Sequence, residues 1–146
     1  MIKAQKVDYL IGATRPPTPG KYMGDVGLDI AADLGEDQSV MLLPGQGTFV
    51  WGGFQVQLPD GYFALVLPRS SSNAAGLMVL TGVIDNGYTG RIGCQVYNIT
   101  CDPITIQNGQ RIAQLVLLPA VRPVPLPVGM FTPTDRGHAG WGSSGT

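Results

Sequence analysis

Short apolar segments recur about every ten residues along this chain, separated by glycine, proline and Asp-Gly turn signals. No window keeps apolar residues at the helical spacing of about 3.6 residues over the length of a helix. Regularly spaced short strands are typical of an all-β sandwich or barrel, including the jelly roll, so we predict an all-β fold. The predicted strands are 1–10, 27–32, 40–44, 48–58, 62–67, 80–84, 92–96, 103–106 and 111–118.

Two further local predictions concern a helix and a loop. One helical turn is expected at 74–77. The loop 14–20 is stiffened by prolines, which cannot donate a ladder hydrogen bond, so it should stay out of the centre of any sheet.

The length and composition fit a single domain. The chain has 146 residues, enough to bury a core without metal or disulfide cross-links. Charged residues make up only 13%, a weak indication that copies of the chain bury surface against each other. We predict a core at 1–119, a proline-rich extended linker at 120–133 and a glycine-rich C-terminal arm at 134–146.

Charge and cysteine content argue against several kinds of partner. The net charge is −1 and the basic residues are scattered, so no nucleic-acid surface is expected. No apolar run reaches membrane-spanning length, so no membrane partner is expected. No secretory signal is seen, and Cys94 and Cys101 are therefore expected to be free thiols. Together with the single histidine, His138, they are too few for a zinc site.

The segment 82–90, GVIDNGYTG, combines turn residues with reactive ones. Apolar residues precede it and alternating apolar residues follow it, a pattern that predicts a β-hairpin. Such a tip is a rigid place to mount a carboxylate, Asp85, and a flat ring, Tyr88. The alternative left open is that Asp85 only forms the turn and Tyr88 only packs in a strand.

Three other polar groups suit a phosphorylated ligand. Arg69 and the serines at 70–72 follow a predicted buried strand, where hydroxyls and backbone N–H groups fit a phosphate or simply cap a helix. The arm carries Arg136 and an aromatic ring among glycines, which suits either closure over a ligand or a disordered terminus. Asp29 and Asp85 are the carboxylates that could hold a phosphate-bound magnesium ion.

Together, five segments resemble the five motifs of the trimeric dUTPase family, in the family order. They are GLDIA at 27–31, PRSS at 68–71, GVIDNGYTG at 82–90, GQRIAQL at 109–115 and RGHAGWGSSG at 136–145. The serine pair after Arg69 and the Tyr-Thr-Gly of the third motif are most similar to the retroviral and phage type. The resemblance implies a β jelly roll that assembles as a homotrimer, in which the arm of one chain closes over a site formed by the others.

The resemblance also implies the reaction, the hydrolysis of dUTP to dUMP and pyrophosphate. This reaction keeps uracil out of DNA and supplies dUMP for dTMP synthesis. Asp85 would activate the water that attacks the α-phosphorus, with Mg²⁺ as cofactor and Asp29 holding magnesium-bound waters. The phosphate-binding residues would be Arg69, Ser70, Ser71, Gln114, Arg136, Ser143 and Ser144. A cytoplasmic location is expected, in the host cytoplasm or the virion if the source is viral.

The same resemblance assigns nucleoside contacts. Main-chain groups of Gly82, Val83 and Ile84 would pair with the uracil edge, where cytosine would leave a buried group unpaired. Tyr88 would pack beneath the deoxyribose and exclude a 2′-hydroxyl, and Trp141 would stack on the base.

Some positions depart from the family pattern, and two rival functions stay open. Trp141 stands where phenylalanine is usual, and the run 89–91 is Thr-Gly-Arg in place of Arg-Gly-acid. A dCTP deaminase shares the fold, but Gln95 stands where that enzyme needs a glutamate to move a proton. The second rival is a dUTPase-like binding or signalling protein that acts through a regulatory partner.

Overall fold

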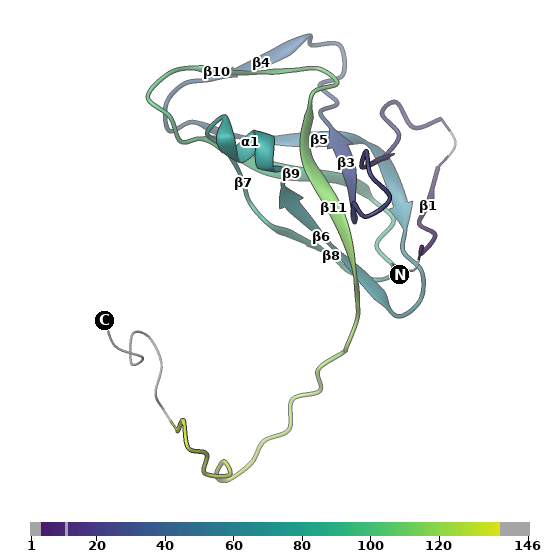
Figure 1. Ribbon diagram of the computed structural model, residues 1–146, viewed down its shortest axis with the longest axis vertical. Coiled ribbons are helices and arrows are strands. Elements are labelled where there is room, and N and C mark those ends of the chain that lie inside the picture. Colours follow the sequence, from purple (N-terminus) through teal and green to yellow (C-terminus); the bar gives the residue numbers. More distant parts are fainter. Residues whose placement is uncertain (1–3, 11, 138–146) are drawn as a thin grey trace.

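The computed structural model describes residues 4–10 and 12–137, which form mostly strands (Figure 1). The strands are β1 (Asp8–Tyr9), β2 (Thr18–Pro19), β3 (Gly27–Ala31), β4 (Ser39–Leu42), β5 (Gly47–Gln57), β6 (Tyr62–Pro68), β7 (Leu77–Val79), β8 (Gly82–Ile84), β9 (Arg91–Asn98), β10 (Ile104–Gln107) and β11 (Arg111–Pro119). The described residues also form one short helix, α1 (Ser70–Ala74). The predicted all-β fold is therefore confirmed.

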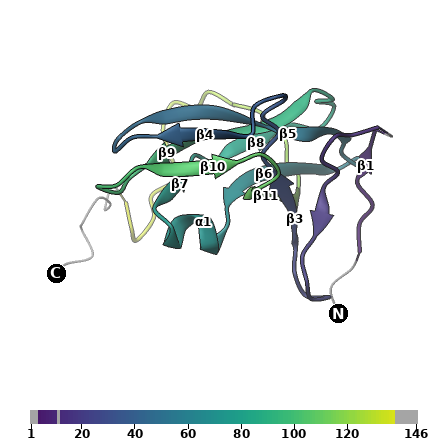
Figure 2. The ribbon, with the colours of Figure 1, turned by 90° about the horizontal axis from the view of Figure 1, so that it is seen from above.

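The strands form three antiparallel sheets. A five-stranded sheet has the order β2-β3-β11-β6-β8, a four-stranded sheet the order β1-β5-β9-β7, and β10 pairs with β4 alone. The helix α1 and the β4–β10 pair lie at the opposite end of the body from β1 (Figures 1 and 2). This topology joins segments that are far apart in the sequence, since β3, β6 and β11 become neighbours in one sheet.

The core lies between the sheets and follows the two-residue alternation of the strands. On β9, Ile92, Cys94 and Val96 are buried, whereas the residues between them face outward. Ile30 on β3 and Ile112 on β11 are fully buried against this surface. Each such side chain contributes about 1.5–3 kcal/mol on burial, so the alternation fixes which faces of the strands point inward.

The hairpin predicted at 82–90 is wrong in its strand pairing. β8 pairs with β6, with Val66 opposite Gly82, whereas β9 pairs with β5 and β7. The segment is therefore a turn that crosses from one sheet to another. The N–H of Tyr88 closes it on the carbonyl of Asp85 over 3.1 Å. Local alternation identified the strands, but it carries no information on their partners.

The helical turn predicted at 74–77 lies too late in the chain, because α1 begins and ends earlier. Gly76 ends the helix with a left-handed φ of +74°, and buried Leu77 then opens β7. The hydroxyl of Ser72 donates to the main-chain carbonyl of Ile112 over 2.7 Å, which fixes α1 against β11. This contact between distant segments is not visible in the local sequence.

Two proline-containing segments lie at the margins of the fold. β2 pairs with β3 at the edge of its sheet, which is where proline is tolerated and where the loop 14–20 was expected to stay. The segment 120–137 has no strand or helix, is exposed, and runs away from the body after β11 (Figure 1). The boundaries proposed for a linker and an arm remain predictions.

Candidate functional site

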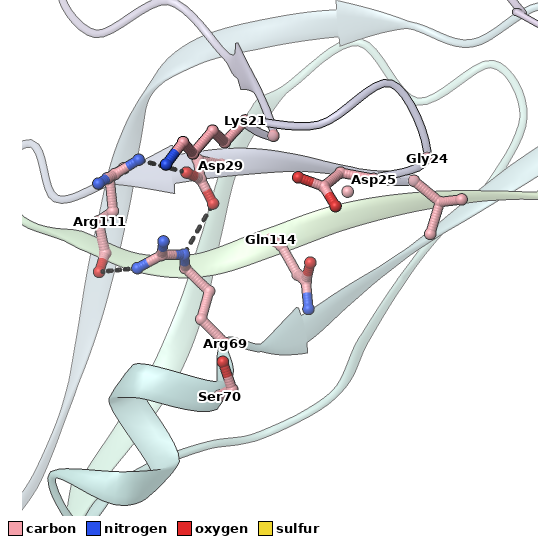
Figure 3. Close-up of a pocket in the computed structure, with 11 residues that line it drawn as sticks. Lys21, Gly24, Asp25, Asp29, Arg69, Ser70, Arg111 and Gln114 are labelled. Carbon is pink, nitrogen blue, oxygen red and sulfur yellow. Dashed lines mark hydrogen bonds and ion pairs between the residues drawn. The ribbon is translucent and has the colours of Figure 1, made fainter.

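The carboxylate of Asp29 lies between two arginines, and we call these three residues the arginine cluster (Figure 3). Asp29 is only 8% exposed, in the middle of β3. Nε of Arg69 donates to its Oδ1 over 2.7 Å, and Nη1 of Arg111 donates to its Oδ2 over 3.0 Å. Arg69 directly precedes α1 and Arg111 opens β11, so two distant segments supply the cations. Two guanidinium groups on one carboxylate leave the cluster with a positive balance.

The arginine cluster lines a pocket of about 570 Å³, which we call the basic pocket. Lys21 adds a third cation to its lining, and Asp25 adds a second carboxylate. The other lining residues are Gly20, Gly24, Val26, Gly27, Ser70 and Gln114. Forked guanidinium donors beside hydroxyl and amide groups suit a phosphate chain.

Polar side chains near the cluster are held in place by specific bonds. Ser70 lines the pocket from the first residue of α1, and the hydroxyl oxygen of Ser71 accepts from Nη1 of Arg69 over 3.1 Å. Nε2 of Gln114 donates to the carbonyl of Pro68 over 3.0 Å. A Cβ at Gly27 would collide with the side-chain oxygen of Gln114, so glycine is needed there for Gln114 to keep this position.

A second pocket, of about 280 Å³, contains Asp85, and we call it the turn pocket. Its lining residues are Phe49, Trp51, Val83, Ile84, Asp85, Tyr88, Arg91 and Gly93. It shares no lining residue with the basic pocket. Within one chain, the two halves of the predicted site are therefore in separate pockets.

The turn that carries Asp85 is anchored on both of its flanks. Nδ2 of Asn86 donates to the carbonyls of Pro59 and Tyr62, over 2.9 and 3.0 Å. On the other flank, Nε2 of Gln55 donates to the carbonyl of Thr89 over 2.9 Å. These bonds use both amide protons of Asn86 and restrict where the neighbouring carboxylate can lie.

The ring of Tyr88 folds back over the end of the turn. Its hydroxyl donates to the carbonyl of Arg91 over 3.0 Å, and a Cβ at Gly90 would collide with the ring. The Arg91 side chain bonds Asp33 over 3.0 Å and lies over the Trp51 ring, with 5.1 Å from Cζ to the ring centroid. Hydrogen bonds and a cation–π contact thus hold Tyr88, Arg91 and Trp51 in fixed positions relative to one another.

The carboxyl of Asp33 is held in its ionised form by several neighbours. A hydrogen bond of 2.8 Å from the Thr14 hydroxyl is the largest cause that lowers its pKa, while burial acts in the opposite direction. The N–H of Gly35 and the positive charges of Arg91 and Arg15 lower the pKa further. Asp33 therefore forms an ion pair with Arg91 that holds the guanidinium in place.

The structure gathers most of the predicted site residues into these two pockets. Those that line the basic pocket are Asp29, Arg69, Ser70 and Gln114. Those that line the turn pocket are Val83, Ile84, Asp85 and Tyr88. Ser71 contacts Arg69, Gly82 lies on β8 beside the turn pocket residues, and Arg136 lies in the exposed segment after β11. Trp141, Ser143 and Ser144 lie outside the described residues.

Three charged residues of the basic pocket were not predicted as site residues. Arg111 opens the predicted strand 111–118, and its position opposite Asp29 follows only from the pairing of β3 with β11. Lys21 and Asp25 lie in the loop before β3, where no local pattern distinguishes them from ordinary surface residues. The signal available for Arg111 was its place inside the segment 109–115.

Two kinds of feature are absent from the described part of the chain. It holds no group of three or more His, Cys, Asp or Glu side chains that could bind a metal ion. None of its helices has the length and apolar character that a membrane crossing needs.

The sequence model of the family described as dUTPase matches residues 16–145. This chain belongs to the dUTPase family. Among curated relatives, a protein of Leifsonia xyli is 40% identical over 143 residues, which cover 95% of this chain and 91% of the relative. A protein of Brucella melitensis is 35% identical over 126 residues, covering 84% and 80%. Both are named deoxyuridine 5'-triphosphate nucleotidohydrolase, the enzyme class that the five motifs predicted.

Solved structures agree with this family assignment. A variant of the dUTPase of Staphylococcus bacteriophage 80alpha, bound to dUpNHpp, is similar with a TM-score of 0.85 and 26% identity. The match covers 98% of this chain and 100% of the phage chain. The dUTPase of phage phi11 of S. aureus, at 24% identity and a TM-score of 0.75, shares the fold. The predicted dUTPase-like fold and the resemblance to phage enzymes are therefore confirmed.

Proposed function

We propose that this dUTPase-family chain hydrolyses dUTP to dUMP and pyrophosphate, which keeps uracil out of DNA and supplies dUMP for dTMP synthesis. The observation that carries the proposal is the division of the molecule into two complementary pockets. The basic pocket offers cations for a triphosphate, and the smaller turn pocket offers Asp85 beside aromatic and apolar walls. A deoxyuridine triphosphate needs both kinds of surface. The activity is assigned to the cytoplasm, of the host cell if the source is viral.

The basic pocket binds the phosphate chain in this proposal. Arg69 and the hydroxyls of Ser70 and Ser71 donate to phosphate oxygens, and the Gln114 amide adds a further contact. Asp29 fixes the direction of the Arg69 guanidinium by accepting from Nε, while Nη1 bonds the Ser71 hydroxyl and the Arg111 carbonyl, so in this proposal Nη2 is the nitrogen that donates to the ligand. Bound charge is neutralised before the reaction, which lowers the cost of bringing a nucleophile to the α-phosphorus.

Asp85 is the general base of the proposed reaction. Its carboxylate orients a water molecule and takes a proton from it as the oxygen attacks the α-phosphorus, and pyrophosphate leaves. The anchored turn supports this role, because Asn86 and Gln55 hold the backbone on either side of Asp85. Proton transfer by a positioned side chain contributes roughly 10²–10⁴-fold to a rate.

Magnesium fits the basic pocket as an ion that the nucleotide brings. Each carboxylate oxygen of Asp29 accepts from one arginine and retains a second lone pair, which suits contact with a metal-bound water. Magnesium at phosphate sites uses one or two carboxylates and keeps several waters, which matches the donors present. When bound, the ion supplies charge stabilisation to the triphosphate oxygens.

The turn pocket binds the nucleoside. Main-chain groups of Gly82, Val83 and Ile84 pair with the uracil edge, so cytosine would leave a polar group unpaired at a cost of about 1–3 kcal/mol. Tyr88 packs beneath the deoxyribose, and its hydroxyl bond to the Arg91 carbonyl keeps the ring in the place that a 2′-hydroxyl would need. Discrimination against dCTP and UTP follows from these contacts.

The active unit is a homotrimer with sites shared between subunits. The separation of the basic pocket from the turn pocket within one chain supports this arrangement, because two subunits can bring the two halves together. The exposed segment after β11 is a connection long enough to carry the arm toward a neighbour (Figure 1). On that arm, Trp141 stacks on the base, and Arg136, Ser143 and Ser144 bind the far phosphate.

The first experiment measures turnover of dUTP, dCTP, dTTP and UTP with magnesium, scoring pyrophosphate, ammonia and the nucleotide product. We expect dUMP and pyrophosphate from dUTP alone, and a loss of at least roughly a hundredfold in kcat for Asp85→Asn. Ammonia from dCTP would move the assignment to a deaminase. A folded trimer that turns over none of the four would favour a binding protein.

The second experiment tests the shared site by complementation. Asp85→Asn and Arg69→Ala, each inactive alone, are co-expressed with different tags and purified as mixed assemblies. If Asp85 and Arg69 of one site come from different subunits, about a third of the sites in the purified mixed trimers regain both residues. Activity no greater than that of either variant alone would contradict sharing.

A further inference from the structure

Two large aromatic side chains lie exposed on the outward face of β5. Phe49 is 49% exposed and Trp51 is 41% exposed. Their rings meet edge to face, with centroids 4.7 Å apart and planes inclined by 67°. Such contacts fix the relative orientation of rings, and paired exposed aromatics often mark a binding surface.

Both rings line the turn pocket, together with Asp85 and Tyr88. The pocket volume of about 280 Å³ is at the lower end for ligand sites, so it suits a nucleoside better than a whole nucleoside triphosphate. The charged groups suited to the phosphates line the other pocket. An aromatic wall in a pocket of this size is therefore placed to contact the uncharged part of a nucleotide.

Glycine on the neighbouring strand makes room for this arrangement. Gly93 of β9 stands opposite Trp51 of β5. A Cβ at Gly93 would lie 2.6 Å from Cε1 of Phe49 and 2.8 Å from the carbonyl oxygen of Val50, both too close. The Phe49 ring thus occupies the space that a side chain on β9 would otherwise fill, and the wall is continuous across the two strands.

The Trp51 ring is also held from its face. The guanidinium carbon of Arg91 lies 5.1 Å from the ring centroid, and Arg91 is itself fixed by its 3.0 Å bond to Asp33. With Phe49 against it and a cation over it, the ring is ordered before any ligand arrives. Preordered aromatic surface binds with a smaller entropic cost than a mobile side chain.

We propose that Phe49 and Trp51 form the apolar wall of the nucleoside pocket and that Trp51 contacts the deoxyuridine part of the substrate as a specificity-determining residue. This inference rests on the proposed dUTP hydrolysis and adds residues outside the five motif segments. The wall contributes affinity for the nucleoside, and the arginine cluster contributes affinity for the phosphates. Removal of the wall therefore weakens nucleoside binding selectively.

The test measures calorimetric binding of dUMP and of inorganic tripolyphosphate to the full chain. The variants are Trp51→Ala and Phe49→Ala, with Met41→Ala as control, because Met41 is an exposed apolar residue of β4 outside both pockets. We expect Kd for dUMP to rise roughly tenfold in Trp51→Ala, as for loss of one base–aromatic contact. Tripolyphosphate affinity should be unchanged, Met41→Ala should match the wild type in both, and KM for dUTP should rise more than kcat falls.

Several outcomes would contradict the proposed role of Phe49 and Trp51. They are unchanged dUMP affinity in Trp51→Ala, an equal loss of tripolyphosphate affinity, or a wild-type chain that binds no dUMP. A change of oligomeric state in Trp51→Ala with intact dUMP binding would mean that a second copy of the chain covers the aromatic pair. If Trp51→Ala does not fold, Trp51→Leu keeps an apolar side chain and gives the same comparison.

Failure of the proposed function gives a different result. The wild-type chain would then bind dUMP, and this binding would depend on Trp51 as expected, but no pyrophosphate would be released from dUTP. That result would contradict the proposed hydrolysis and would still support the nucleoside-binding role of Phe49 and Trp51.

Discussion

The guanidinium of Arg69 bonds Asp29 through Nε, over 2.7 Å, and its Nη1 donates to the main-chain carbonyl of Arg111 over 3.3 Å. The side chain of Arg69 is 23% exposed, whereas that of Arg111, on the other oxygen of Asp29, is 58% exposed. Water screens an exposed ion pair far more than a sheltered one. The two bonds to one carboxylate should therefore contribute unequally to stability.

This inequality is measurable by double-mutant cycles on unfolding in denaturant, at fixed protein concentration. We expect a coupling energy of about 1.5–3 kcal/mol between Asp29 and Arg69, since a sheltered hydrogen bond joins two charges. The coupling between Asp29 and Arg111 should be below about 1 kcal/mol. A cycle that pairs Asp29 with Arg122, in the exposed segment after β11, should be additive. Equal couplings for the two cluster arginines would contradict the argument.

Asn86→Ala should lower the turnover number of dUTP hydrolysis more than it lowers stability. The change removes both hydrogen bonds to the carbonyls of Pro59 and Tyr62, so the backbone beside Asp85 is released. A misplaced catalytic group costs up to roughly a hundredfold in rate, and we expect kcat to fall between about ten- and a hundredfold. Affinity for dUMP, measured by calorimetry, should change little.

Asn108→Ala is the matched control for that variant. Asn108 also precedes a glycine in a turn and bonds main-chain groups of Leu34 and Gly35, but it lines neither pocket. It should lose stability to a similar degree and retain kcat. If both variants lose activity in proportion to stability, the asparagine beside Asp85 has no positioning role.

The stability of the fold should depend on pH through Asp33. Its pKa in the folded chain is lowered from the usual value of 3.8, chiefly by the hydroxyl of Thr14. The carboxylate therefore stabilises the fold fully above that value, and the contribution is lost as pH falls through the lower folded pKa. Urea unfolding of Asp33→Asn should show a constant deficit against the wild type from neutral to mildly acidic pH, and a shrinking one below about pH 3.8. A deficit that grows on acidification would be the opposite of this expectation.

The two thiols should differ in reactivity toward Ellman's reagent. Cys94 is buried in the core, and burial raises its pKa to about 12, so almost no thiolate forms at neutral pH. Cys101 is exposed. The native chain should show one fast thiol, which Cys101→Ser removes and Cys94→Ala leaves, and the second thiol should react only on unfolding. Rapid modification of both thiols in the native protein would mean that the core opens readily.

The sequence predicted the strand content and many of the residues that line the two candidate pockets, because these depend on local signals. Alternation marked β9, and the residue types around Asp29, Arg69 and Asp85 marked the chemistry. Arg69 and Gln114 were expected to act on the same phosphates, and the pairing of β6, β11 and β3 does bring them to one pocket. Here a family resemblance supplied what local signals cannot, namely which distant segments belong together.

What could not be predicted depends on contacts between distant segments. The pairing of β8 with β6 in place of β9 is a choice among partners, and alternation is the same for each. Arg111 acts on Asp29 because a sheet aligns them, and Trp51 lines the turn pocket because β5 runs beside β9. Surface alternation alone presents Trp51 as an ordinary outward residue.

The side-chain amide of Asn86 also exposes the turn beside Asp85 to slow chemical damage, namely deamidation. It precedes Gly87, which has a φ of +89°, and asparagine beside such an unhindered glycine is the side chain most open to spontaneous deamidation. Hydrolysis of that amide would replace a double donor with an anion facing two carbonyls, and would place a second negative charge next to Asp85. A stored preparation would then lose activity while it keeps its fold, and the modified chains would be heavier by about one mass unit.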